Sequence, residues 1–218
     1  MKAKNRISFK KLGVAAGLLA AFVVWTVLVC LVDVQAIGPL GSEVGFATLN
    51  GWFHRTTGVH LSLYNITDAI SILPLAIIGG FGVLGLVQMI RRRSPLKVDR
   101  DILVLGGFYV IVLAVFFLFE MLDINYRPIL IEGVLEASYP SSTTMLAISV
   151  LTTAALQFRR RIPNRPLRIG GVAATLALMV FIVVCRTISG VHWLSDIIGG
   201  GLFSAGMVLA YDALSAEG

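Results

Sequence analysis

Residues 185–196 read CRTISGVHWLSD and place Arg186, His192 and Asp196 in a stretch that otherwise resembles the edge of a membrane helix. His192 and Asp196 are four residues apart, so on a helix their side chains share a face and can meet. A carboxylate beside an imidazole fixes its tautomer and raises its basicity, which suits the histidine to act as a nucleophile or a base. The alternative is an interfacial histidine that only forms hydrogen bonds. Ionisable residues in membrane segments are costly, however, and they usually pair or line a pathway.

Two arginines, Arg127 and Arg186, lie in separate polar segments that could form a binding site for an anion. Arg127 lies in segment 122–144, and Arg186 opens segment 186–196. If the chain packs so that these segments meet, two converging guanidinium groups need an anion. Their forks of donors match phosphate oxygens, so we expect a phosphate monoester or a diphosphate.

Hydroxyl side chains cluster in YPSSTTM, residues 139–145. Pro140 can begin a helix, and Ser141 and Ser142 then place hydroxyl and backbone N–H groups at its first turn, where the helix dipole favours an anion. Ordinary capping of a helix by serine or threonine is the alternative interpretation.

The composition indicates which elements must position these residues. The chain has 57% apolar and 14% charged residues and a mean hydropathy of +0.88, which excludes an ordinary soluble domain. We predict an all-α, polytopic membrane helical bundle with a basic N-terminal segment at 1–12, a membrane domain at 13–214 and a short tail at 215–218. Six apolar runs approach the length that a membrane-spanning helix requires: 13–32, 70–90, 102–121, 143–158, 169–185 and 194–214.

The distribution of cations predicts how this bundle lies in the cell membrane. Of the 18 Lys and Arg residues, five lie in each of the segments 2–11, 91–100 and 159–168, which leaves Arg55, Arg127 and Arg186. Cytoplasmic loops carry most Lys and Arg, so we expect a multi-pass protein with both termini in the cytoplasm and the two arginines of the anion site at the outer face. The net charge of +6 follows from this topology. We therefore expect membrane lipids, and no nucleic acid, as partners.

The segment CRTISGVHWLSD resembles the third motif, S-R-x5-H-x3-D, of the type 2 phosphatidic acid phosphatase family, the integral-membrane relatives of vanadium haloperoxidases. Arg186, His192 and Asp196 match in type and spacing, while Cys185 replaces a serine. The resemblance implies the six-span fold of that family. It also implies that His192 is the nucleophile, which forms a phosphohistidine, and that Asp196 orients it.

The first family motif, K-x6-R-P, is matched in part by EMLDINYRP. Arg127 and Pro128 agree, but Glu120 stands where the lysine is expected. A carboxyl group beside a phosphate could stay protonated and serve as an acid. It could instead join other carboxylates around a divalent cation such as Mg²⁺, or it could point elsewhere. The candidate partners for a cation are Asp123, Glu132 and Glu136. The resemblance requires no cofactor and no metal ion.

The second family motif, P-S-x-H, is matched in part by PSST. Pro140 and Ser141 agree, but Thr143 replaces the histidine that protonates the leaving alcohol in this family. A threonine hydroxyl is too weak an acid for that role, and help from a general acid contributes about 10²–10⁴ in rate. Phosphate leaves more readily than an alkoxide, so a diphosphate would suit this site best.

The resemblance implies that Arg127 and Arg186, with Ser141, Ser142 and neighbouring backbone amides, hold the phosphoryl oxygens and stabilise the transition state. We therefore expect a membrane phosphatase that hydrolyses a lipid phosphate or diphosphate of the polyprenyl or phosphatidic acid type. The alternative is a catalytically silent relative that binds a lipid phosphate or a membrane partner. A further hypothesis is that an amphipathic piece of segment 36–69 lies over the site.

Overall fold

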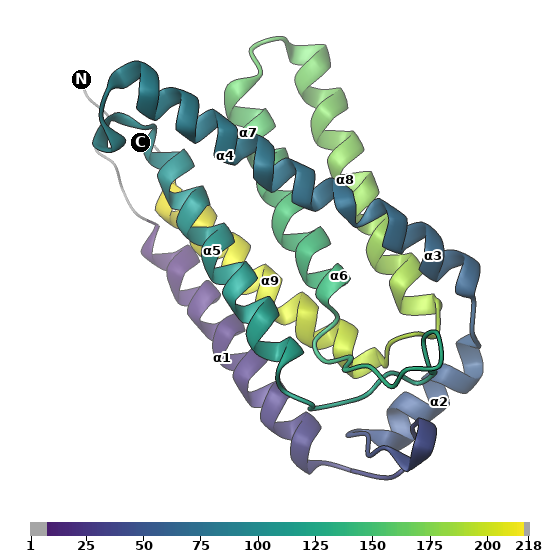
Figure 1. Ribbon diagram of the computed structural model, residues 1–218. Helices are drawn as coiled ribbons and strands as arrows, with labels where there is room; N and C mark the ends of the chain where they lie inside the picture. Colours follow the sequence, from purple (N-terminus) through teal and green to yellow (C-terminus); the bar gives the residue numbers. More distant parts are fainter. Residues whose placement is uncertain (1–7, 216–218) are drawn as a thin grey trace.

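The protein forms a bundle of helices, shown in Figure 1 for a computed structural model that describes residues 8–215. Within those residues every regular element is helical, as the composition predicts, and only isolated β-bridges occur. In chain order the elements are α1 (Phe9–Leu31), η1 (Pro39–Gly41), α2 (Ala47–Thr57), α3 (Leu61–Ile70), α4 (Ile72–Arg92), η2 (Pro95–Lys97), α5 (Arg100–Glu120), α6 (Ser142–Leu146), η3 (Ala147–Leu151), α7 (Thr152–Arg161), α8 (Arg165–Ile188) and α9 (Leu194–Ser215).

Five helical stretches of the described chain are long and apolar enough to cross a membrane. Four of them are α1, α5, α8 and α9, and the fifth combines α3 with α4 over Leu61–Arg92. Together they make the chain a multi-pass membrane protein. Five of the six predicted spans are therefore present. The combined stretch begins nine residues before the predicted start at Ile70, because α3 continues almost directly into α4.

The predicted span at 143–158 is not among these five. Its residues form three consecutive helical segments, α6, η3 and α7, which run inside the bundle. Ser149, Thr153 and Gln157 on this stretch are fully buried, and the side chains of Thr153 and Gln157 bond to other helices. For example, the hydroxyl of Thr153 lies 3.0 Å from that of Tyr109 on α5. A helix surrounded by protein can be more polar than one that faces lipid, which explains the shortness of the apolar run.

The helices α1 and α9 lie side by side along much of their length (Figure 1). Gly206 on α9 allows the close approach, because a side chain there would collide with Leu19 and with the carbonyl oxygen of Ala15. Small residues of this kind are the usual means by which membrane helices pack. At one end of the pair, the Nζ atom of Lys11 lies 2.5 Å from a carboxylate oxygen of Asp212.

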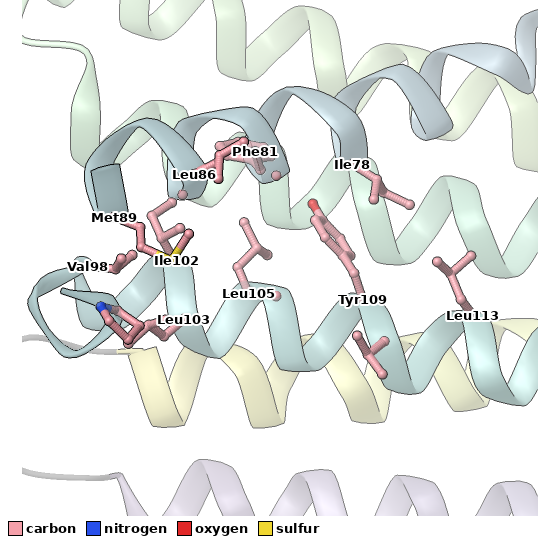
Figure 2. Close-up of a pocket in the computed structure, with 15 residues that line it drawn as sticks. Ile78, Phe81, Leu86, Met89, Val98, Ile102, Leu103, Leu105, Tyr109 and Leu113 are labelled. Carbon is pink, nitrogen blue, oxygen red and sulfur yellow. The ribbon is translucent and has the colours of Figure 1, made fainter. Parts of the chain in front are cut away.

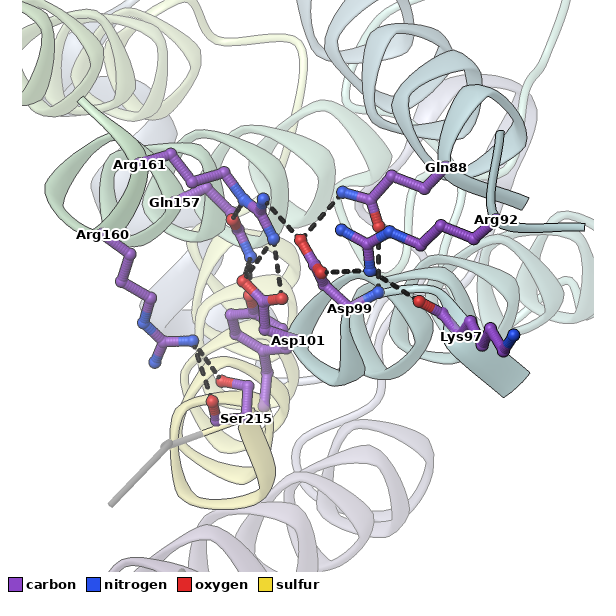
Figure 3. A network of polar contacts seen from close by, with 10 residues as sticks. Gln88, Arg92, Lys97, Asp99, Asp101, Gln157, Arg160, Arg161 and Ser215 are labelled. Carbon is purple, nitrogen blue, oxygen red and sulfur yellow. Dashed lines mark hydrogen bonds and ion pairs between the residues drawn. The ribbon is translucent and has the colours of Figure 1, made fainter. Parts of the chain in front are cut away.

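The basic segments 91–100 and 159–168 lie at one end of the bundle, where they contribute to the network of Figure 3. Arg161 at the end of α7 makes ion pairs with Asp99 at 3.0 Å and with Asp101 at 2.7 Å. Arg92 at the end of α4 pairs with Asp99 at 2.8 Å. Hydrogen bonds from Arg92 and then Arg161 lower the pKa of Asp99 to about 2. This network joins the ends of α4, α5 and α7, while Arg127 and Arg186 lie toward the opposite end.

Candidate functional site

His192 lies in the five-residue connection between α8 and α9, at the end of the bundle opposite the basic segments. Its side chain is buried, and its Nδ1 atom lies 3.7 Å from Oδ2 of Asp196. On the other side of the ring, Nη1 of Arg127 lies 3.4 Å from Nε2. A guanidinium group can only donate hydrogen bonds, so Nε2 is the acceptor and the ring hydrogen is on Nδ1, facing Asp196. The lone pair of Nε2 is therefore directed to the side of Arg127.

The electrostatic surroundings of His192 keep its imidazole neutral. Burial lowers the pKa of His192 to about 4, against the opposing effect of its contact with Asp196. The positive charges of Arg127 and Arg186 also contribute to this lowering of the pKa of His192. At neutral pH the ring consequently keeps the unprotonated nitrogen that a nucleophile or a base requires.

The carboxylate of Asp196 is fully buried in the first turn of α9. Its Oδ2 atom accepts a hydrogen bond from the backbone N–H of Trp193 at 3.0 Å, and its Oδ1 atom accepts one from Asn125 at 3.2 Å. The backbone N–H of Ser141 donates to the carbonyl oxygen of Asp196 at 3.1 Å. These bonds hold the start of α9 against the segments that carry Arg127 and Ser141.

Arg186 extends from the last turn of α8 and is 2% exposed. Its Nη2 atom donates to Oγ1 of Thr143 at 2.7 Å and to Oδ1 of Asp68 at 3.1 Å. Its Nε and Nη1 atoms are buried and have no hydrogen-bond partner among the residues that the structure describes. Leaving a buried charged donor unpaired is costly, so these two nitrogens indicate a missing acceptor.

The aromatic ring of Tyr64 on α3 lies beside both arginines. The guanidinium carbon of Arg186 is 4.7 Å from the centre of this ring, and that of Arg127 is 5.9 Å from it. The Nε atom of Arg127 also pairs with a carboxylate oxygen of Glu136 at 2.9 Å. The three motifs of the sequence thus meet in space, as the resemblance implies, and α3 adds Tyr64 and Asp68 to them.

A narrow pocket opens at His192 and Arg127, between the end of α5 and the start of α6. Ser142 and Glu120 line this pocket, and Glu120 is exposed. Ser141 does not line it, because its buried hydroxyl donates to Thr144 at 3.0 Å. No three His, Cys, Asp or Glu side chains within residues 8–215 are close enough together to hold a metal ion.

Segment 36–69 covers this end of the bundle with α2 and α3, which the sequence indicated only as a hypothesis. The turn between them packs on the connection that carries His192, since the backbone N–H of His60 donates to Ser189 at 2.9 Å. Gly190 has a φ of +71°, and a side chain there would collide with the carbonyl oxygen of Gly58. This contact requires glycine for both its conformation and its size.

The motifs of the sequence did not predict several residues that the structure places at the site. Asn125 and Asn50 are fully buried amides that hold the start of α9, and Asn50 donates to Ser195 Oγ at 2.8 Å. Asn125 stands two residues before Arg127, inside the first motif, and this position indicates a residue of the site. The position of Asp68 at the edge of an apolar run was another, because ionisable residues there are rarely without a partner.

Comparison with known proteins identifies the family and the fold of this chain. A family model described as the PAP2 superfamily matches residues 107–215, which include Arg127, Arg186, His192 and Asp196. The fold is similar to a crystal structure described as the first transmembrane PAP2 type phosphatidylglycerolphosphate phosphatase from Bacillus subtilis, with a TM-score of 0.56 and 18% sequence identity over 91% of this chain and 93% of that chain. Comparison with curated proteins gives no match. The family match confirms the resemblance drawn from the three motifs, and the chain belongs to the PAP2 superfamily.

Proposed function

We propose that this protein is a membrane phosphatase that hydrolyses a lipid phosphate or diphosphate through a phosphohistidine at His192. Family membership and fold support a phosphatase of the lipid type. One observation carries the finer proposal. The buried guanidinium of Arg186 has two nitrogens without a partner in the described chain, and the neutral imidazole of His192 directs its Nε2 lone pair toward the guanidinium of Arg127. Phosphate supplies both the oxygens that Arg186 lacks and a phosphorus atom for His192.

In the proposed reaction, Nε2 of His192 attacks the terminal phosphorus while the bond to the leaving oxygen breaks. Arg127 and Arg186 bind the non-bridging oxygens and stabilise the charge spread over them in the transition state. The imidazole gains positive charge as the N–P bond forms, and the carboxylate of Asp196 on the Nδ1 side stabilises that charge. Water then attacks the phosphohistidine, which releases phosphate and restores the neutral ring.

The position of Thr143 indicates which leaving group this site accepts. Its hydroxyl accepts a hydrogen bond from Arg186 at 2.7 Å, so it positions the arginine instead of supplying a proton. A leaving group that needs no acid is then favoured, and this makes a diphosphate a better substrate than a monoester of an alcohol. Glu120 lines the same pocket, and that location favours the interpretations in which it faces the phosphate over the one in which it points elsewhere. No required metal ion is part of the proposal.

The proposed topology places both termini in the cytoplasm and the pocket at the outer face of the cell membrane. Support comes from the separation of charges, because the network around Arg161 and the pocket around His192 lie at opposite ends of the bundle. Membrane-impermeant thiol labelling of a cysteine introduced at Arg55 should then occur from outside the cell, and labelling of one introduced at Arg93 should require disruption of the membrane.

The test of function is phosphate release by purified protein in detergent from a panel of polyprenyl phosphates, polyprenyl diphosphates and phosphatidic acid, with and without Mg²⁺. His192→Ala should abolish release, while the matched control His60→Ala should retain it, because the side chain of His60 is exposed. Trapping a phosphohistidine that is stable to alkali and labile to acid would identify the intermediate. Release unchanged in folded His192→Ala would refute the mechanism. Binding of these lipids without release from the wild type would establish the silent relative.

A further inference from the structure

A second pocket lies between α4 and α5, on the half of the bundle that carries the basic segments. Its volume is about 430 Å³, within the range of ligand pockets in general. Figure 2 shows that apolar side chains such as Phe81, Met89 and Leu105 point into it from both helices. The one hydroxyl in its lining, that of Tyr109, lies 3.0 Å from the hydroxyl of Thr153 and is thus already paired. The lining therefore suits a hydrocarbon chain.

Glycines create this hollow. Gly82 on α4 and Gly106 on α5 both line the pocket, and a Cβ atom added to either would meet no other atom within 4 Å. The pocket is open to the surface, since Leu103 and Val110 on its rim are 47% and 67% exposed. In a membrane this surface faces lipid chains, which can enter the pocket from the side.

The rim of the pocket at the basic end carries unpaired positive charge. Pro95 and Val98 line it, and they belong to the connection between α4 and α5 that also contains Arg93 and Lys97. Arg91, Arg93 and Lys97 are exposed and make no ion pair with the described chain, whereas Arg92 is engaged by Asp99. Cations next to a membrane surface attract anionic headgroups, each with about a fivefold preference.

This pocket is separate from the phosphatase site. Leu103 on its rim and Glu120 beside His192 are 17 residues apart on α5, which corresponds to roughly 25 Å along a helix. A lipid whose headgroup lies at Arg93 consequently cannot present a phosphate to His192. The occupant of this pocket is therefore not positioned as a substrate.

We infer that the pocket between α4 and α5 binds one acyl chain of an anionic glycerophospholipid, whose headgroup lies against Arg91, Arg93 and Lys97. The lipid comes from the leaflet next to the basic segments. The hydrophobic effect does not favour moving an acyl chain from the bilayer into the pocket, because both surroundings are apolar. The preference for this lipid therefore comes from van der Waals packing in the hollow beside the glycines and from the attraction between the cations and the headgroup. The bound chain fills the space between two helices that contact each other only loosely, and so it stabilises their association.

The test measures binding of dioleoyl phosphatidylglycerol to purified protein in detergent by native mass spectrometry and by its effect on the melting temperature. Dioleoyl phosphatidylcholine has the same chains without the net charge. We expect phosphatidylglycerol to bind at least about tenfold more tightly than phosphatidylcholine and to raise the melting temperature. Replacing Arg91, Arg93 and Lys97 by glutamine together should remove this preference.

The hollow itself is tested by Gly106→Leu, which fills it, with Gly107→Leu as the matched control. Gly107 is the next residue on α5, is exposed, has the same free space around it and does not line the pocket. We expect Gly106→Leu to lose the bound lipid and Gly107→Leu to keep it, and Gly82→Leu on the opposite wall should repeat the loss. Equal binding by the Gly106 and Gly107 variants would overturn the inference, as would equal binding of the two lipids by the wild type. These measurements need no phosphatase activity, so they stand apart from the proposed function.

Discussion

The substitution Arg186→Lys tests the contribution of the hydrogen bonds that a guanidinium group can make and a lysine ammonium cannot. Lysine keeps the positive charge next to the exposed carboxylate of Asp68, so the substitution does not remove the cation of that ion pair. A lysine ammonium is a single point of charge, however, and it cannot bind Thr143 and Asp68 on one side and phosphate on the other. In the wild type the Nη2 atom of Arg186 donates to both Thr143 and Asp68, while its Nε and Nη1 atoms remain for the phosphate. The variant should therefore fold but bind the transition state poorly.

The expected size of the effect follows from the two nitrogens that lysine cannot replace. A hydrogen bond that involves a charged group contributes about 1.5–3 kcal/mol, so losing two costs about 3–6 kcal/mol. Expressed as kcat/KM for phosphate release, this is a decrease of about 10² to 10⁴-fold. Arg55→Lys is the control, because Arg55 is an exposed arginine on α2 outside the site. A lysine variant at position 186 within about tenfold of the wild type would show that these nitrogens do not bind the phosphate.

Three further predictions concern single groups. Asn125→Ala removes a buried donor to Asp196 and should lower the free energy of unfolding by about 1–3 kcal/mol, measured by equilibrium unfolding in mixed micelles; an unchanged value would contradict the role of this hydrogen bond. Nuclear magnetic resonance of protein labelled at histidine should show His192 titrating near pH 4, with His192→Ala to assign the signal, and a midpoint near 6.5 would mean that the ring is solvated. The lowered pKa of Asp99 makes its ion pairs with Arg92 and Arg161 stabilising above about pH 4, and that contribution should be lost as the pH falls toward 2. Thermal unfolding of Asp99→Asn should lack this part of the pH dependence, and an identical profile in the wild type and the variant would refute the assignment.

The sequence predicted the parts of this molecule that depend on local spacing. Membrane helices follow from apolar runs, and the proximity of His192 to Asp196 follows from their spacing of four residues. Segment 143–158 is helical, as predicted, but it is not among the five apolar spans, because it carries polar side chains that other parts of the protein bury. Tyr64 and Asp68 could not be placed at the site, since Asp68 meets Arg186 across 118 residues of chain. Such a contact depends on how α3 packs on α8, which no local pattern encodes.

The pairing of α1 with α9 has a consequence for how the protein is made. Ribosomes insert α1 into the membrane before α9 exists, so the surface around Ala15 and Leu19 must first be covered by lipid or by a helper protein. Only when α9 emerges can Gly206 close against that surface, and the indole of Trp25 can then donate to the backbone of Ser195 at the start of α9. The helix that carries Asp196 is thus the last to be secured. A nascent chain arrested before α9 would hold four of the five apolar spans in the bilayer and still lack Asp196.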